Sequence, residues 1–420
     1  MNKRIYIFVT NSIYGLGGAQ LLTLRRSRYL RDKGWRVLII YRRKMGEFRL
    51  ESDFKEFDTL FIPEFTCHYN FVNNRKKIKI TNQISEYLSN IDKENSFIES
   101  NDLVCAVWAE YLSQVFGIKH ALYMLSEENI NRLFYYPYKR FYEYKLYRNE
   151  LWGCNSRGLE ISFGKLLPQF NTNYVNVAYN EDEIPDVSLP SLILEKKKNT
   201  IVVSTLTRLE KEYLPVLIEV IGSICIKRKE IDVCFVIGGG SVENKVENRI
   251  RKMAEEMNRS ISNLHIIITG YIKPGKDFFS QTDIFIGMGT AAISALSQGC
   301  IVLPVNPITN KTPGVFGVET FNFAYPESNV EFLISDKILQ LLLLSTEKRY
   351  DYAKQSKEYY NNNFTLDVTF DAFRNLCDKM QDVDTYSFKN AYFFKPLDYI
   401  VELARRIRSL IYFIIGKMGR

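Results

Sequence analysis

The chain has 420 residues, 46% hydrophobic and 25% charged, which is long enough for two or three domains and too apolar for a disordered protein. Seven scattered cysteines without Cys-x-x-Cys spacing and only three histidines argue against a disulfide framework and a zinc or histidine-rich metal site, and fit a reducing cytoplasm. The net charge is +8, and half of it lies in residues 395–420, which contain six basic and two acidic residues. This local excess of positive charge indicates an anionic surface rather than nucleic acid as the partner.

The first half of the chain alternates predicted strands and helices. Residues 3–9 alternate like a strand and lack a small-residue cleavage site, so we expect no signal peptide, and no uncharged apolar run reaches the ~18 residues of a membrane span. A glycine loop, an amphipathic helix over 19–34 and a strand over 35–41 follow, which implies a parallel sheet. Further strands are expected at 58–63, 102–108, 120–125, 150–156 and 174–179.

The second half repeats this alternation after a predicted interdomain linker. Residues 180–198 contain two prolines and a charge run, which is typical of a linker. We expect strands at 200–206, 232–240, 265–270, 283–286 and 300–306, and helices at 214–229, 246–258, from Thr290 onward and at 346–380. The pattern predicts an α/β protein with two doubly wound Rossmann-like domains, residues 1–185 and 186–375, and C-terminal helices with a basic amphipathic tail over 376–420.

Glycines follow the first predicted strand, at Gly15, Gly17 and Gly18. They suggest a dinucleotide fingerprint, but G-x-G-x-x-G would need a glycine where Gln20 stands, and the second strand ends in Tyr-Arg-Arg rather than in an acidic residue. NAD binding is therefore disfavoured. A flexible turn without a ligand remains the alternative.

Three more strand ends of the second half carry candidate binding residues. Arg208 and Lys211 could clamp a diphosphate, the alternative being a solvated charged loop. Gly238, Gly239 and Gly240 allow close approach of a ligand to the backbone. The turn at 287–289 places Gly289 and Thr290 at a helix N-terminus without a nearby carboxylate, an arrangement that favours a phosphate, with the Thr290 hydroxyl as a further donor.

In their order along the chain, these segments resemble GT-B glycosyltransferases of family 4, the "group 1" type. The likeness spans roughly residues 3–375 and is closest to members of bacterial surface-polysaccharide pathways, such as those for capsule and O-antigen. It rests on Gly17-Gly18-Ala19-Gln20, Val177-Ala178-Tyr179-Asn180, the strand ending in Arg208-Leu209, Val236-Ile237-Gly238-Gly239-Gly240 and Ile268-Thr269-Gly270-Tyr271-Ile272.

The chain departs from the family pattern at four positions. Two glutamates eight residues apart are usual in the family, and alignment puts Ile286 and Ser294 in their places. The usual lysine is Tyr213, for which Lys211 is a candidate substitute. The histidine expected at the end of a middle strand of the first domain is replaced in the region 126–128.

The resemblance implies a glycosyltransferase that moves a sugar from a nucleotide diphosphate sugar to a lipid-linked or polysaccharide acceptor in surface-glycan biosynthesis. The two domains would face each other across a cleft, no metal would be obligatory, no cofactor besides the donor would be needed, and the product would retain its anomeric configuration. Arg208 and Lys211 would neutralise the diphosphate, and Glu127 or Glu128 would remove a proton, unless both are merely exposed surface acids. The expected donor-binding residues are Gly238, Gly239, Gly240, Gly270, Tyr271, Gly289, Thr290 and Ser294, and the acceptor-binding residues are Gly17, Gly18 and Ala19.

Two other functions stay open. The missing glutamates fit a degenerate, non-catalytic GT-B partner or scaffold of a polysaccharide assembly complex. A GT-B enzyme that isomerises or hydrolyses a nucleotide sugar without an acceptor is the other alternative.

The C-terminal tail predicts peripheral attachment to the inner face of the cytoplasmic membrane. Apolar residues recur at helical spacing from Leu397 to Met418 with arginines beside them, and residues 410–415 are apolar all round. The alternative is a helix that packs against the first domain.

Overall fold

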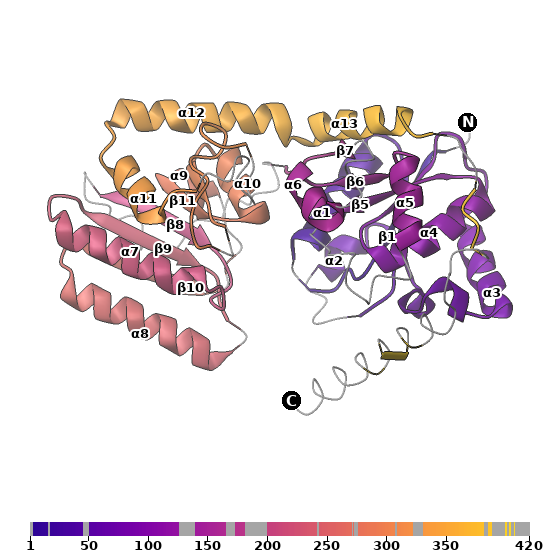
Figure 1. The fold of residues 1–420 in the computed structure, drawn as a ribbon, viewed down its shortest axis with the longest axis horizontal. Helices are drawn as coiled ribbons and strands as arrows, with labels where there is room; N and C mark the ends of the chain where they lie inside the picture. Colours follow the sequence, from indigo (N-terminus) through magenta and orange to yellow (C-terminus); the bar gives the residue numbers. More distant parts are fainter. Residues whose placement is uncertain are drawn as a thin grey trace. The chain divides into compact units, whose positions relative to one another are not determined.

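The computed structural model describes residues 3–15, 17–44, 50–125, 139–164, 173–180, 200–241, 243–270, 272, 276–306, 309–321, 331–381, 385–388, 400, 403, 404 and 407. The chain divides into two compact units, one of residues 1–178 with 369–420 and the other of residues 179–368 (Figure 1). The boundary predicted at 185/186 lies outside the described residues, as does most of the tail. Residues 369–375, expected in the second domain, belong to the first unit.

The first unit is built on a seven-stranded sheet in the order β3-β2-β1-β4-β5-β6-β7, and every neighbouring pair is parallel. Its strands are β1 (Ile5–Thr10), β2 (Arg36–Tyr41), β3 (Asp58–Phe61), β4 (Phe97–Ser100), β5 (Lys119–Met124), β6 (Leu151–Gly153) and β7 (Asn173–Tyr174). Its helices are α1 (Gly18–Asp32), α2 (Glu51–Phe54), α3 (Asn74–Ser85), α4 (Leu103–Phe116), α5 (Lys139–Tyr147) and α6 (Ser156–Phe163), with 3-10 turns η1 (Pro63–Thr66), η2 (Tyr69–Phe71) and η3 (Glu86–Leu88).

The strand predicted at 102–108 is wrong, because these residues begin α4. Asp102 caps this helix: its carboxylate accepts hydrogen bonds from the backbone N–H groups of Val104 and Cys105 at 2.9 and 3.0 Å. Most of α4 is buried, so its first residues form a continuous apolar run without a polar face. Such a short apolar run does not distinguish a buried helix from a buried strand. The strand of this region is β4, which the sequence did not reveal.

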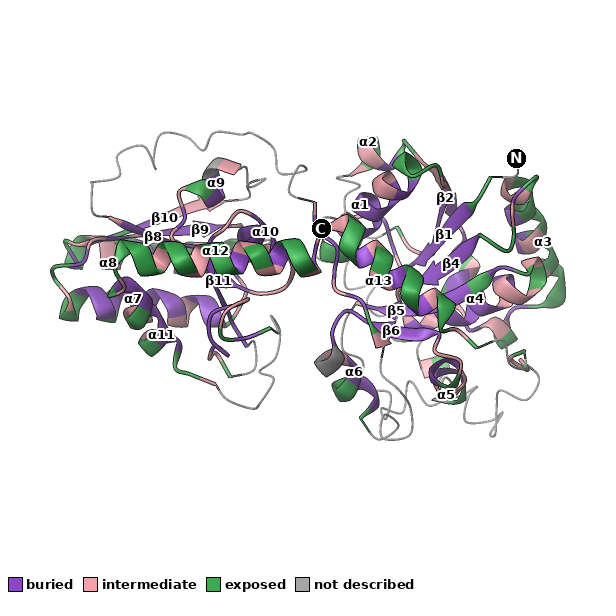
Figure 2. Cartoon of the chain, turned by 90° about the horizontal axis from the view of Figure 1, so that it is seen from above, coloured by how far each residue is buried: buried purple, intermediate pink, exposed green. Residues whose placement is uncertain are grey.

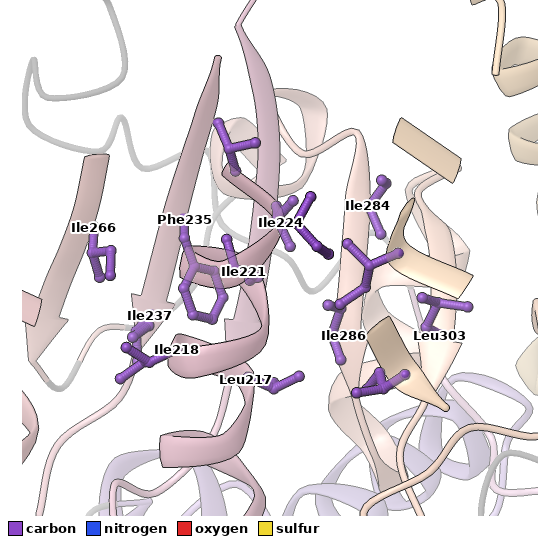
Figure 3. Close-up of a cluster of buried hydrophobic side chains, with 14 of the residues drawn as sticks. Leu217, Ile218, Ile221, Ile224, Phe235, Ile237, Ile266, Ile284, Ile286 and Leu303 are labelled. Atoms are coloured by element: carbon purple, nitrogen blue, oxygen red, sulfur yellow. The ribbon is translucent and has the colours of Figure 1, made fainter. Parts of the chain in front are cut away.

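The second unit has a five-stranded parallel sheet in the order β10-β9-β8-β11-β12. Its strands are β8 (Ile201–Leu206), β9 (Val233–Gly238), β10 (Leu264–Gly270), β11 (Ile284–Gly287) and β12 (Ile301–Pro304). Its helices are α7 (Tyr213–Lys227), α8 (Asn244–Ser260), α9 (Lys276–Ser280), α10 (Gly289–Ser297), α11 (Ile334–Leu342) and α12 (Thr346–Asn363). In its core, Leu217, Ile218 and Ile221 of α7 and Phe235 and Ile286 of the sheet belong to one buried cluster (Figure 3).

The single helix predicted over 346–380 is two helices, α12 and α13 (Leu366–Asp378). Phe364 separates them: it is 1% exposed, and its backbone N–H still donates to the carbonyl of Tyr360. Its own carbonyl accepts the backbone N–H of Tyr179 at 2.8 Å. A buried aromatic residue and this long-range hydrogen bond therefore end α12.

Residues 369–378 of α13 return to the first unit through aromatic contacts. The ring of Phe373 lies 4.9 Å from that of Phe97 and 5.1 Å from that of Trp152, both edge-on. In the tail, residues 400, 403, 404 and 407 are helical. Across the described ranges, no helix combines the length and the apolarity that a membrane crossing would need.

Candidate functional site

The strand order of the second sheet identifies its carboxyl edge as a binding region. Strand order reverses between β8 and β11, which pair directly through Ile284 with Val203 and Phe285 with Ser204. In open parallel sheets, the loops that leave neighbouring strands diverge at such a point, and ligands bind beside it. The loop after β8 carries Arg208 and Lys211, and the turn after β11 carries Gly289 and Thr290.

Backbone hydrogen bonds tie the loops of this edge together. The N–H of Thr207 donates to the carbonyl of Gly238 at 2.9 Å, and the N–H of Gly239 donates to the carbonyl of Gly270 at the same distance. Gly239 has φ +140°, and a Cβ there would lie 1.8 Å from the Thr207 carbonyl oxygen. The contact between the loops therefore requires this glycine, whatever it binds. Donor contacts by Gly238, Gly239 and Gly240 stay predictions.

Arg208 and Lys211 lie on a turn at this edge, where the Lys211 N–H donates to the Arg208 carbonyl at 3.1 Å. Arg208 is exposed and Lys211 half-buried, and within the described part of the chain neither side chain has an ion-pair partner. Between them, the Glu210 carboxylate accepts a 2.6 Å hydrogen bond from the Ser241 hydroxyl after β9. No local sequence pattern predicts this bond, since it joins positions 31 residues apart.

Tyr213, which stands where the resemblance expects a lysine, is a core residue. Its side chain is 2% exposed at the start of α7. Burial raises the pKa of Tyr213, and the neighbouring hydroxyls of Thr207 and Thr205 lower it in part. The buried phenol of Tyr213 cannot supply a positive charge to a ligand at this edge. Lys211 therefore stays the candidate for the positive charge that the family's lysine would supply.

The N-terminus of α10 is open to an anion. Met288 precedes it in an extended conformation, with φ −144° and ψ 164°, no side chain of the described residues caps it, and its first turn has no acidic residue. Gly289 has φ +61°, and a Cβ at Gly289 would meet nothing within 4 Å among the described atoms. Gly270 has φ +72° and equally open surroundings. Since the first N–H groups of a helix lack intrahelical partners, this end can accept a phosphate.

The two positions where the family carries glutamates are both packed. Ile286 is fully buried in the core of the second unit (Figure 3). Ser294 is 8% exposed, and its hydroxyl donates to the Thr290 carbonyl at 2.9 Å within α10. The structure thus gives Ser294 a packing role, and its predicted contact with a ribose stays a prediction.

The residues expected at the acceptor lie in the first unit, at the carboxyl edge of β1. Gly17 precedes α1 in an extended conformation, and Gly18 and Ala19 are exposed in its first turn, which has no acidic residue. Beside them, the Asn11 carbonyl accepts the N–H groups of both Arg42 and Arg43. Of the remaining predicted site residues, Glu127, Glu128 and Tyr271 lie outside the described residues.

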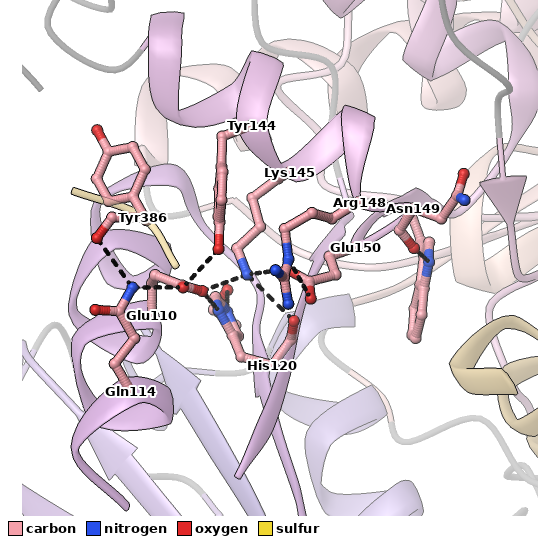
Figure 4. Close-up of polar contacts among 11 residues, drawn as sticks. Glu110, Gln114, His120, Tyr144, Lys145, Arg148, Asn149, Glu150 and Tyr386 are labelled. Atoms are coloured by element: carbon pink, nitrogen blue, oxygen red, sulfur yellow. Dashed lines mark hydrogen bonds and ion pairs between the residues drawn. The ribbon is translucent and has the colours of Figure 1, made fainter. Parts of the chain in front are cut away.

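A second group of ionisable side chains lies away from these edges. Lys145 of α5 contacts Glu110 of α4 and Glu150, which precedes β6, and His120 lies at the beginning of β5 (Figure 4). His120 bonds to Glu110 at 3.2 Å through Nδ1 and to Ser100 at 2.9 Å through Nε2. His120 and Glu150 stand at the amino ends of their strands and Ser100 is the last residue of β4, while the charged side chains of the cluster are all buried within the first unit.

Comparison with known proteins shows the fold. No protein-family model matches the chain, and no curated protein sequence matches it. Among solved structures, a glycosyltransferase from Rickettsia africae ESF-5 is similar with a TM-score of 0.63 and 16% identity, covering 91% of this chain and all of the other. Anabaena HepE in complex with UDP and glucose gives a TM-score of 0.55 and 13% identity, covering 89% of this chain and all of HepE.

A further similar structure is a mutant of S. aureus TarM in complex with fondaparinux, alpha-GlcNAc-glycerol and UDP. Its TM-score is 0.54 and its identity 13%, covering 89% of this chain and 99% of TarM. These likenesses and the two parallel sheets confirm the predicted α/β fold of GT-B type with two Rossmann-like domains.

Proposed function

We propose that this protein is a glycosyltransferase that uses a nucleotide diphosphate sugar. The observation that carries the proposal is the open N-terminus of α10 at the strand-order reversal, with Arg208 and Lys211 on the loop of the adjacent strand. A helix N-terminus and two cations suit a diphosphate. Support also comes from HepE, whose structures were determined with UDP and with UDP-glucose.

In the proposed reaction, the bond between the sugar C1 and the diphosphate oxygen breaks, and a bond from C1 to an acceptor hydroxyl oxygen forms. The nucleoside diphosphate leaves with the bonding electrons. Arg208, Lys211 and the α10 N–H groups stabilise the charge that develops on it. The acceptor proton passes to Glu127 or Glu128, or to solvent. In this proposal the product retains the anomeric configuration and no metal is obligatory.

The acceptor is a lipid-linked or polysaccharide glycan of a bacterial surface pathway, such as capsule or O-antigen synthesis, bound at Gly17, Gly18 and Ala19. We further propose that the protein is cytoplasmic and attaches to the inner membrane face through its tail. Ile400, Leu403 and Ile407 support this, because they are 63%, 57% and 51% exposed at helical spacing. Truncation after Asn390 should release a folded protein from membranes, whereas a truncated chain that only unfolds would favour the tail packed against the first unit.

A second candidate is a non-catalytic GT-B partner or scaffold of a polysaccharide assembly complex. The packed Ile286 and the internally bonded Ser294 favour it, because neither can replace a carboxylate that grips a ribose. A non-catalytic scaffold would not need to bind a nucleotide sugar, whereas a glycosyltransferase must bind one as its donor.

Incubation with a panel of nucleotide sugars, with and without a membrane extract as acceptor source, tests the proposal. Transfer to extract lipid or glycan supports the glycosyltransferase. Release of nucleoside diphosphate or conversion of the donor without any acceptor would identify the hydrolase or isomerase instead. A folded protein that neither binds nor turns over any donor would leave the scaffold.

A further inference from the structure

Helix α3 of the first unit carries a basic surface that the proposed reaction does not use. Its twelve residues include four cations and no acid: Arg75, Lys76, Lys77 and Lys79. Its buried residues are Ile80 and Ile84. The helical period therefore places Arg75, Ile78, Lys79 and Asn82 on the opposite face, where all four are exposed. Figure 2 shows exposed stretches along α3.

An exposed isoleucine stands within this basic face. Ile78 is 59% exposed, with Arg75 one turn before it and Lys79 next to it. Cations alone would suit any polyanion. An apolar side chain among cations suits an anionic lipid bilayer, because the cations contact headgroups while the isoleucine enters the headgroup–acyl boundary.

The segment that leads to the tail is fixed beside α3. Asn70 donates from Nδ2 to the Phe388 carbonyl at 3.3 Å, and the rings of Tyr69 and Phe388 lie 4.4 Å apart. The Lys77 ammonium lies 3.6 Å from the centre of the same Tyr69 ring. Residue 400, where the described helical residues of the tail begin, follows twelve residues later, so the chain holds it within about 40 Å of this point.

The tail continues the same combination of features. Ile400, Leu403 and Ile407 share one helix face and are exposed. Residues 395–420 carry an excess of four positive charges, and α3 carries four more. Together these two segments account for the whole net charge of +8, so the rest of the chain is electrically balanced.

We propose that the exposed face of α3 binds an anionic phospholipid bilayer, with Arg75, Ile78 and Lys79 as the contacts on the folded unit and with Ile400, Leu403 and Ile407 as a second contact. The proposal deepens the membrane contact proposed above for the tail and does not depend on the donor chemistry. Two contact points on one chain bind a surface more tightly than either alone.

Flotation of the full-length protein with vesicles of phosphatidylcholine, with or without phosphatidylglycerol, tests this surface. The double variant Arg75→Glu/Lys79→Glu should bind anionic vesicles at least about tenfold more weakly, because it reverses two charges at the contact. The matched control is Lys252→Glu/Arg259→Glu on α8, whose side chains are 78% and 79% exposed. It changes the net charge equally and should bind within about twofold of the parent protein.

The variant Ile78→Ser distinguishes binding to a bilayer from binding to other polyanions, because only a bilayer offers an apolar layer for the isoleucine. It changes no charge and should weaken vesicle binding about threefold. Equal losses in the α3 and α8 variants, or no loss in the α3 variant, would overturn the proposal. Tighter binding to duplex DNA than to anionic vesicles would overturn it in favour of nucleic acid. Loss of binding on removal of residues 391–420, with none in the α3 variant, would leave the tail alone as the membrane contact.

Discussion

Lys145 and Glu150 form a buried ion pair, with 2.6 Å between Nζ and Oε2 and side chains 0% and 5% exposed (Figure 4). Lys145 also lies 2.5 Å from the Glu110 carboxylate, and Arg148 binds the other oxygen of Glu150 at 2.9 Å. One buried ammonium thus holds α4, α5 and the beginning of β6 together. Charges buried in this way depend on their partners, because water no longer solvates them.

We expect Lys145→Met to lower the free energy of unfolding by about 3–5 kcal/mol, since it leaves two carboxylates without their shared cation. Urea denaturation followed by circular dichroism measures this. The control is Lys252→Met, which removes an exposed cation 3.9 Å from Glu256 and should cost less than about 0.5 kcal/mol. Equal, small losses in both variants would show that the buried pair is replaceable.

The same cluster predicts destabilisation in acid. Burial and the Lys145 charge lower the pKa of His120 from 6.5 to about 3. Burial raises the pKa of Glu110, but Lys145 and His120 outweigh it and hold this pKa well below its usual range. Between pH 6.5 and 3 the unfolded chain binds the His120 proton and the folded chain does not, so stability falls as the pH falls, by at most about 1.4 kcal/mol per pH unit.

Denaturation at a series of pH values checks this slope. Between pH 6 and about 5, where glutamates are still ionised in both states, His120→Gln should flatten it. His265→Gln, at an exposed histidine of β10, should leave the slope unchanged. An unaltered slope in the His120 variant would assign the acid sensitivity to other groups.

The sequence predicted both sheets but not every boundary within them. Alternation of strand and helix patterns indicated parallel strands, and the glycines at 238–240, 270 and 289 do lie at one edge of the second sheet. One local and one long-range contact explain what was missed. The Asp102 side chain caps α4, so the apolar run after it forms a helix rather than a strand. The long-range hydrogen bond from Tyr179 to Phe364 interrupts the helix predicted through Phe364. The bond between Glu210 and Ser241 and the burial of Ser294 exist only in the folded chain.

Arg208→Ala should reduce sugar transfer by about 30- to 1,000-fold while the protein stays folded. Its side chain is exposed at the carboxyl edge, so it contributes to charge stabilisation of about 2–4 kcal/mol rather than to packing. Initial rates with the active donor, together with a thermal melt, measure both effects. Arg228→Ala, which removes an arginine 42% exposed after α7, is the matched control and should retain its activity. Near-parental activity of the Arg208 variant would remove the diphosphate role.

Ser294→Glu should destabilise the protein rather than improve donor binding. Ser294 is 8% exposed and bonded within α10, so a glutamate there buries a carboxylate and costs about 2 kcal/mol or more. Ser294→Ala should cost about 1 kcal/mol. Chemical denaturation and titration with uridine and guanosine diphosphates are the measurements. Tighter nucleotide binding with unchanged stability would show instead that this position is open to the ribose.

Thr290→Asp tests whether the α10 N-terminus holds a phosphate. We expect the parent protein to bind a nucleoside diphosphate weakly, with a Kd of about 1 mM, because phosphate contacts are present and the family's ribose-binding carboxylate is absent. An aspartate in the first turn of α10 favours the helix dipole by about 0.3–1 kcal/mol, so stability should hold or rise while its charge repels the phosphate. Calorimetric titration should then show at least about tenfold weaker binding, with Thr290→Ser close to the parent protein. Unchanged affinity in the aspartate variant would place the phosphate elsewhere. If the folded parent protein binds no nucleoside diphosphate, the enzyme proposal is wrong and the scaffold is the remaining candidate.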